Sequence, residues 1–135
     1  MSADRVELVR SLFDLWNAGQ HDAAAFPDYF DPAIELESPF SSIRGAPYQG
    51  YAGIEEWVRD QDEQFAVWSI SADELRQVGD RVIAITTVEA RGRASEIALH
   101  VHAAAVVDFA NDQRLKRVRI YTDVNEARKA VGLEP

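Results

Sequence analysis

The apolar residues of this chain recur with two periods, that of a helix and that of a strand. Within residues 4–18, Val9, Leu12 and Trp16 fall on one stripe at spacings of three and four, which predicts an amphipathic helix. Residues 95–109 are long, apolar and free of Gly and Pro, which predicts the longest strand of a sheet. The strands before and after it in sequence are expected to pair with it.

The same patterns, with Gly, Pro and Asp at turns and caps, place the remaining elements. They predict helices at 4–18, 23–26, 52–65 and 124–131, strands at 33–38, 67–78, 81–91, 95–109 and 114–122, and a loop at 39–50. Helices gathered on one face of a bent sheet give an α+β fold. We expect a curved antiparallel sheet that forms a cone around three N-terminal helices, with a short C-terminal helix and a ligand cavity at the wide end.

Composition limits the classes of protein to which the chain can belong. Its 135 residues, 47% of them apolar, are enough for a single domain, spanning residues 1–135, with a core of its own. The absence of Cys excludes disulfides, thiolate nucleophiles and Cys-ligated zinc, and it fits a reducing cytosol. The charged N-terminus lacks the apolar region of a signal peptide, and no apolar run is long enough for a membrane helix. We therefore expect a cytoplasmic protein.

The net charge and the motifs of the chain argue against nucleic acid, metal ions and cofactors as binding partners. The formal net charge of −9 repels phosphate backbones, so no nucleic-acid partner is expected. No set of residues has the spacing of a metal site, and no glycine-rich loop follows a strand. Neither a metal nor a cofactor is expected.

Several short motifs occur in an order typical of one family. They are L-W-N-A-G at 15–19, F-D-P-A-I at 30–34, E-S-P at 37–39, G-Y-A-G-I at 50–54, G-D-R-V at 79–82 and Y-T-D-V-N-E-A at 121–127, followed by A-V-G-L at 130–133. With these motifs the chain resembles SnoaL-like domains of the nuclear transport factor two-like superfamily, which includes ketosteroid isomerase and polyketide cyclases. The resemblance implies the cone fold, a homodimer packed through the outer face of the sheet, and a small apolar ligand or substrate. It implies no single reaction, because this fold hosts enzymes, binders and assembly domains.

The catalytic groups of ketosteroid isomerase are absent at the matching positions. Its carboxylate base corresponds to Ser38, its phenol to Leu12, and the protonated Asp of its oxyanion hole to Ala105. A serine does not replace a carboxylate base without its own activator. Ketosteroid isomerase chemistry by that route is therefore not expected.

The histidines of the long strand are the remaining candidates for acid–base chemistry. Side chains alternate between faces along a strand. If Val107 and Phe109 face the cavity, counting back from Phe109 places Ala105 on the same face and turns His100 and His102 outward. A β-bulge would reverse this and allow a His102–Asp123 pair at the cavity mouth. Otherwise Asp123 caps the last helix. The weak catalytic candidates are His102, Asp123 and Tyr51, the last as a phenolic donor.

Glu35 and Glu37 share one face of the first strand. Leu36 and Ser38 claim the inner face, so we expect the two carboxylates to be solvated or paired with the basic last strand. Paired acids for hydrolysis would require a rotated strand.

The residues expected to line the cavity are aromatic or apolar, with a few hydroxyls. They are Trp16, Tyr29, Phe30, Ser38, Phe40, Trp57, Thr86, Ala105, Val107, Ile120 and Thr122. The alternative for Trp16 and Phe30 is that they simply fill the core. Such walls suit a planar or polycyclic apolar ligand.

Three functions follow from these expectations. The first is a protein that binds a small apolar molecule. The second is an isomerase, cyclase or dehydratase acting on a polyketide- or steroid-like carbonyl compound. The third is a dimeric interaction domain whose cone is filled by side chains.

Overall fold

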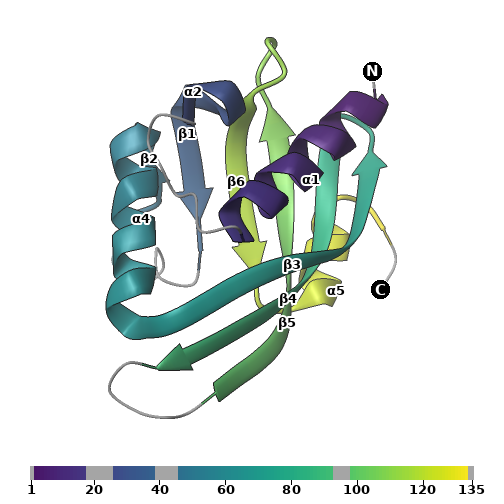
Figure 1. Ribbon diagram of the computed structural model, residues 1–135. Coiled ribbons are helices and arrows are strands. Elements are labelled where there is room, and N and C mark those ends of the chain that lie inside the picture. Colours follow the sequence, from purple (N-terminus) through teal and green to yellow (C-terminus); the bar gives the residue numbers. More distant parts are fainter. Residues whose placement is uncertain (1, 18–25, 39–45, 93–97, 134–135) are drawn as a thin grey trace.

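A computed structural model describes residues 2–17, 26–38, 46–92 and 98–133 of the chain. Its elements, in order, are α1 (Ser2–Asn17), α2 (Phe26–Tyr29), β1 (Phe30–Glu37), β2 (Tyr48–Gln49), α4 (Gly50–Gln64), β3 (Phe65–Val78), β4 (Arg81–Gly92), β5 (Ala98–Phe109), β6 (Leu115–Tyr121) and α5 (Val124–Ala130). Figure 1 shows a strongly curved sheet with α1 and α4 on its concave side and α5 on the other.

The six strands form one sheet in the order β2-β1-β6-β5-β4-β3. β5 pairs antiparallel with β4 and with β6, its neighbours in sequence, as predicted. β1 pairs parallel with β6, so the sheet is mixed and the expectation of a wholly antiparallel sheet was wrong in this respect. The two strands are joined through α4 and several further strands, so no hairpin fixes their relative direction.

Most elements lie where the apolar pattern predicts them, with differences at the ends. The second helix was predicted at 23–26, but α2 begins at Phe26, and residues 18–25 lie outside the described part of the chain. The predicted loop at 39–50 ends in the short strand β2. β3, with 14 residues, exceeds the 12 described residues of β5.

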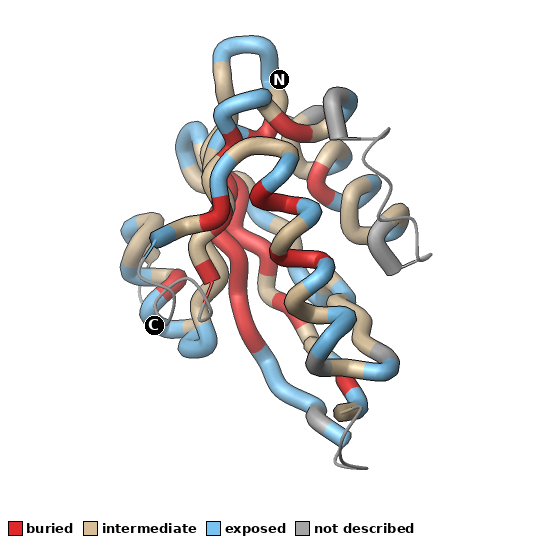
Figure 2. The backbone as a smooth tube through the Cα atoms, turned by 90° about the vertical axis from the view of Figure 1, so that its left-hand side faces the viewer, coloured by how far each residue is buried: buried red, intermediate tan, exposed pale blue. Residues whose placement is uncertain are grey.

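Alternating side chains divide the core between the two faces of the sheet. On the concave face, Ile34, Leu36 and Val107 belong to a buried cluster with residues of α1 and α4. On the convex face, Ala104 and Val106 pack with residues of α5 in a second cluster. Figure 2 shows the buried backbone running through the middle of the sheet. The strict alternation along β5 is what presents alternate residues to two different cores.

Close contacts hold α1 and α4, the helices of the concave side, against the sheet. Arg5 of α1 donates from Nε to the Gln113 side chain at 2.6 Å and from Nη1 to the Asp80 carbonyl at 2.6 Å, so the helix is attached to two turns of the sheet. At Gly53 of α4, an added Cβ would lie 2.9 Å from the carbonyl carbon of Tyr48. The helix therefore needs glycine there to pack closely on β2.

Candidate functional site: an apolar pocket

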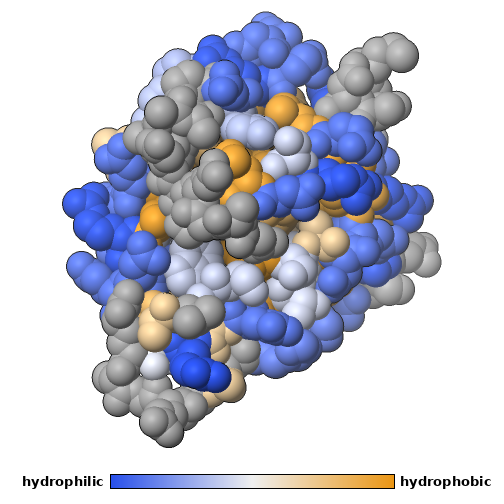
Figure 3. Space-filling view, viewed as in Figure 1, coloured by the Kyte–Doolittle hydropathy of each residue, from blue (hydrophilic) through white to orange (hydrophobic). Residues whose placement is uncertain are grey.

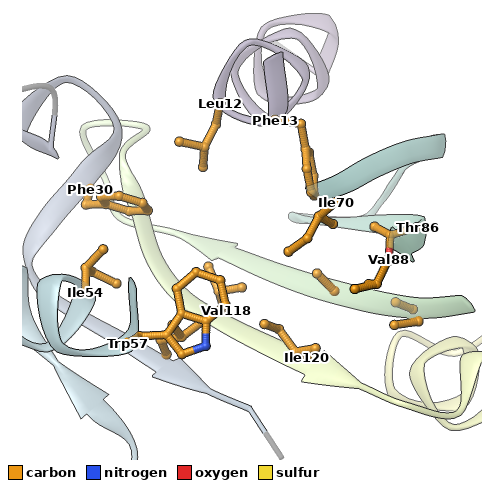
Figure 4. Close-up of a pocket in the computed structure, with 14 residues that line it drawn as sticks. Leu12, Phe13, Phe30, Ile54, Trp57, Ile70, Thr86, Val88, Val118 and Ile120 are labelled. Atoms are coloured by element: carbon orange, nitrogen blue, oxygen red, sulfur yellow. The ribbon is translucent and has the colours of Figure 1, made fainter. Parts of the chain in front are cut away.

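The concave face of the sheet encloses a pocket beneath α1 and beside α4 (Figure 4). Its volume is about 110 Å³. The lining residues are Leu12, Phe13, Phe30, Leu36, Ile54, Trp57, Ile70, Thr86, Val88, Ala103, Ala104, Ala105, Val118 and Ile120. Figure 3 shows apolar residues gathered near the middle of this side of the molecule, among hydrophilic ones.

Small residues of β5 leave the space that the pocket occupies. Ala103 and Ala105 are buried and stand on the concave face, where a larger side chain would reach into the pocket. Ala104 also borders the pocket, although it packs with Ala127 of α5 in the convex cluster. Val101 follows on the concave face of β5 but is 46% exposed, since β3, β4 and β5 extend past α1 (Figure 1).

One wall of the pocket is the indole ring of Trp57. The residue is 7% exposed and meets Trp68 edge to face, with ring centroids 5.6 Å apart. Thr86 lies on the opposite side of the pocket, on β4 (Figure 4). The Thr86 hydroxyl and the Trp57 indole N–H are the polar side-chain groups among the described lining residues. None of these residues is ionisable.

The structure brings five of the predicted pocket residues together: Phe30, Trp57, Thr86, Ala105 and Ile120. Phe30 belongs to the buried cluster and also lines the pocket. The Trp16 side chain and Phe40 lie outside the described part of the chain, and their places in the pocket stay predictions.

The residues that line this pocket do not include four others predicted for it: Tyr29, Ser38, Val107 and Thr122. Thr122 is exposed because β6 ends at Tyr121, so the alternation of the strand does not extend to it. Ser38 is buried just beyond the end of β1. Val107 is buried deeper in the core.

Tyr29 is half-buried, and its hydroxyl lies 3.2 Å from that of Ser11. That contact turns its polar end toward α1. A residue's place on the correct face of an element was therefore not enough to put it in the pocket.

The remaining lining residues are not among those predicted from the sequence; they are Leu12, Phe13, Leu36, Ile54, Ile70, Val88, Ala103, Ala104 and Val118. The signal was present for several of them. Leu12 and Phe13 belong to the apolar stripe of α1, and Val88 and Val118 lie two residues from Thr86 and Ile120 on the same strand faces.

The residues predicted for acid–base chemistry lie elsewhere. β5 pairs with β4 without a register shift from the Val82–Val107 pair to the Arg91–Ala98 pair, so within these strands no bulge turns His102 inward. His102 is exposed, with Nδ1 3.4 Å from the Thr87 hydroxyl oxygen.

The other two candidates are engaged in structural hydrogen bonds. Asp123 is exposed and caps α5, because its side chain accepts a hydrogen bond from the Asn125 backbone N–H at 2.9 Å. The Tyr51 hydroxyl donates to the Phe30 carbonyl at 2.8 Å. A His102–Asp123 pair at the cavity mouth is therefore not formed.

The two glutamates of β1 are paired with the last strand, as expected. Arg117 Nη2 lies 2.8 Å from Glu37 Oε1, and its Nε lies 3.9 Å from Glu35 Oε2. The hydrogen bond to Glu37 raises the pKa of Arg117 above its usual value. These side chains are half-buried on the convex face, away from the pocket.

The described residues contain neither a metal-binding cluster nor a helix that could span a membrane. No group of three or more His, Asp or Glu side chains in this part of the chain could hold a metal ion. Among the same residues, no helix is long and apolar enough to cross a membrane.

A curved sheet that holds an apolar pocket under its helices defines the class of α+β proteins with the cone fold. Within that class, the chain belongs to the family of the SnoaL-like domain, whose model matches residues 9–118. The match includes the pocket-lining residues from Leu12 to Val118. No curated protein matches the chain in sequence.

Solved structures share the fold at low sequence identity. An NTF2-like protein of unknown function from Burkholderia pseudomallei K96243 has a TM-score of 0.77 and 16% identity, with 98% of this chain and 99% of that chain covered. A protein from Jannaschia sp. CCS1, provisionally named a SnoaL-like polyketide cyclase, has a TM-score of 0.75 and 17% identity over 99% and 95% of the two chains. TerC, co-crystallised with polyporic acid, has a TM-score of 0.75 and 15% identity over 94% and 97%.

Proposed function

We propose that this SnoaL-like protein binds a small apolar molecule in the pocket between the sheet, α1 and α4. The observation that carries the proposal is the lining itself, in which side chains from both helices, from β1 and from β3 to β6 meet around a space of about 110 Å³. Ligand sites are typically concave and mostly apolar, with few polar groups. Open space also weighs against the alternative of a cone filled by side chains.

The size of the pocket favours a ligand of about one ring. An apolar cavity of about 150 Å³ stays dry and accepts benzene. The space here is somewhat smaller, at about 110 Å³. A four-ring, steroid-like molecule would extend out of the pocket or need its walls to move, so the planar polycyclic ligand expected from the sequence is not favoured.

Binding is favoured over acid–base catalysis by the chemistry of the lining. An isomerase, cyclase or dehydratase needs a proton donor or acceptor within hydrogen-bond reach of its substrate. The described lining residues include no carboxylate, imidazole, amine or phenol. The polyketide cyclase name of the Jannaschia protein bears on fold alone, at 17% identity.

Titration of the protein with toluene, followed by calorimetry, tests the proposal. We expect saturable binding with a stoichiometry of one per chain. Ala105→Leu should abolish it, because the added carbons enter the pocket from β5. Absence of saturable binding to the natural chain, or equal binding by the folded Ala105→Leu variant, would refute the proposal.

We further propose that two copies associate through the convex face of the sheet, in the cytosol. That face carries charged groups of both signs beside an aromatic residue: Glu89, His100, His102, Arg119 and Tyr121. Such mixtures are typical of polar interfaces. Sedimentation equilibrium tests the association, and a monomer at high concentration would contradict it. Fractionation of cells that produce the protein tests the location.

A further inference from the structure

The hydroxyl of Thr86 is a buried polar group that faces the pocket. Thr86 is 3% exposed and lines the pocket from β4. Within the described part of the chain, its hydroxyl makes no hydrogen bond. Buried polar groups in folded proteins nearly always have a partner, and leaving one without costs about 1–3 kcal/mol. The partner of this hydroxyl is therefore to be sought in what enters the pocket.

Water alone is a poor partner at this position. A buried water typically makes about three hydrogen bonds to protein groups. Thr86 offers one, and the Trp57 indole lies on the opposite side of the pocket, while the other described lining side chains are apolar. A water molecule beside Thr86 would keep too few partners to be held firmly. A ligand that carries its own polar atom on an apolar body satisfies the hydroxyl without this loss.

The same lining excludes a charged ligand group. No described lining residue carries a charge. Transfer of an ionised group into such surroundings without a counter-charge is heavily disfavoured. The polar atom must therefore belong to a neutral group.

We propose that the ligand is a neutral, single-ring molecule with one oxygen function, and that the Thr86 hydroxyl recognises this oxygen. The inference rests on the proposed function and adds the chemical class of the ligand. A ligand carbonyl accepts a hydrogen bond from Thr86 Oγ1, whereas a ligand hydroxyl donates to it. The ring lies against Trp57 and the alanines of β5.

Toluene and phenol test this assignment, since they differ by a methyl group in place of a hydroxyl. Their dissociation constants are measured by calorimetry for the natural chain and for Thr86→Val, which keeps the shape of the side chain and removes the hydroxyl. We expect Thr86→Val to weaken phenol relative to toluene about five-fold, the effect of one neutral hydrogen bond. The ligand-free variant should be as stable as the natural chain or more so, because an unpaired buried hydroxyl is removed.

Two further variants separate the hydroxyl from its surroundings. Thr86→Ser keeps the hydroxyl and should keep the natural ratio of phenol to toluene binding. Thr87→Val changes the same residue type one position along β4, where the Thr87 hydroxyl donates to Asp73 at 2.5 Å on the convex face. It should leave the ratio unchanged. If Thr86→Val does not fold, Thr86→Ala takes its place with the same expected change in ratio.

The outcomes distinguish the two proposals. If toluene binds the natural chain but Thr86→Val leaves the ratio within about two-fold of its natural value, the Thr86 assignment is overturned and the binding function stands. If neither probe binds the natural chain, both are overturned.

Discussion

Replacement of Trp57 by Ala tests whether this ring is both a core residue and a wall of the pocket. The ring is 7% exposed and packs edge to face on Trp68 at 5.6 Å. Truncation of a buried aromatic residue to Ala costs about 3–5 kcal/mol. We expect the lower end, about 3 kcal/mol, because one side of the ring already faces open space and loses few contacts there.

The expected loss converts to a shift in melting temperature. An unfolding entropy of about 2.1 cal/mol/K per residue gives about 0.28 kcal/mol/K for the 135 residues of the chain. A loss of about 3 kcal/mol then lowers the Tm by about 10 °C. Urea unfolding followed by circular dichroism measures the free energy without depending on the fluorescence of the tryptophan removed.

The variant should also bind larger ligands. Removal of the indole enlarges the pocket, so naphthalene should gain affinity relative to toluene. Trp68→Ala is the matched control, since Trp68 is half-buried, donates to Asp62 Oδ1 at 2.9 Å and does not line the pocket. It should cost less stability and leave the ligand preference unchanged. A Trp57→Ala variant within about 0.5 kcal/mol of the natural stability, with the natural ligand preference, would refute the reasoning.

Three other predictions concern the β5 wall of the pocket, the convex face of the sheet and the turn between β5 and β6. Ala105→Leu should abolish toluene binding, and it should change the free energy of unfolding by no more than about 1–3 kcal/mol, the cost of overpacking. Retained binding would contradict the conclusion that toluene occupies the space beside Ala105. Arg117→Gln should lower the free energy of unfolding by about 0.5–1 kcal/mol at low salt and less at high salt, because its pair with Glu37 is more than a third exposed and screened. Equal losses at both salt concentrations would show that the effect is not electrostatic. Hydrogen bonds from Arg114 hold the pKa of Asp112 below the usual Asp value of about 3.9. The stabilisation is thus present above that pH and is lost as the pH falls through the folded-state pKa. NMR titration should show this low pKa, and Arg114→Gln should raise it; an unchanged pKa in the variant would contradict the assignment.

The alternation of side chains made several faces predictable from the sequence. Counting back from Phe109 placed Ala105 on the concave face and His102 on the convex face, because successive strand residues point to opposite sides. The same count turned Glu35 and Glu37 away from the core, toward the basic residues of the last strand. Such local geometry needs no knowledge of distant contacts.

Membership of the pocket was less predictable, because it depends on where each element ends and what covers it. Thr122 has the correct spacing from Ile120 but lies past the end of β6. Val101 has the correct spacing from Ala103 but is 46% exposed, beyond the cover of α1. Tyr51 carries a phenol suited to chemistry, yet its hydroxyl is engaged by the Phe30 carbonyl.

The sequence by itself determined most of the elements, the faces of the strands and the membership of the family, since these follow from periodicity and short motifs. The tertiary structure decided the parallel pairing of β1 with β6, the room left above Ala103 and Ala105, and the lack of a partner for the Thr86 hydroxyl within the described chain. These properties arise from side chains that are distant in sequence and meet only when the sheet curves over the helices. The volume of a pocket and the pairing of a buried hydroxyl are set by all of its neighbours together.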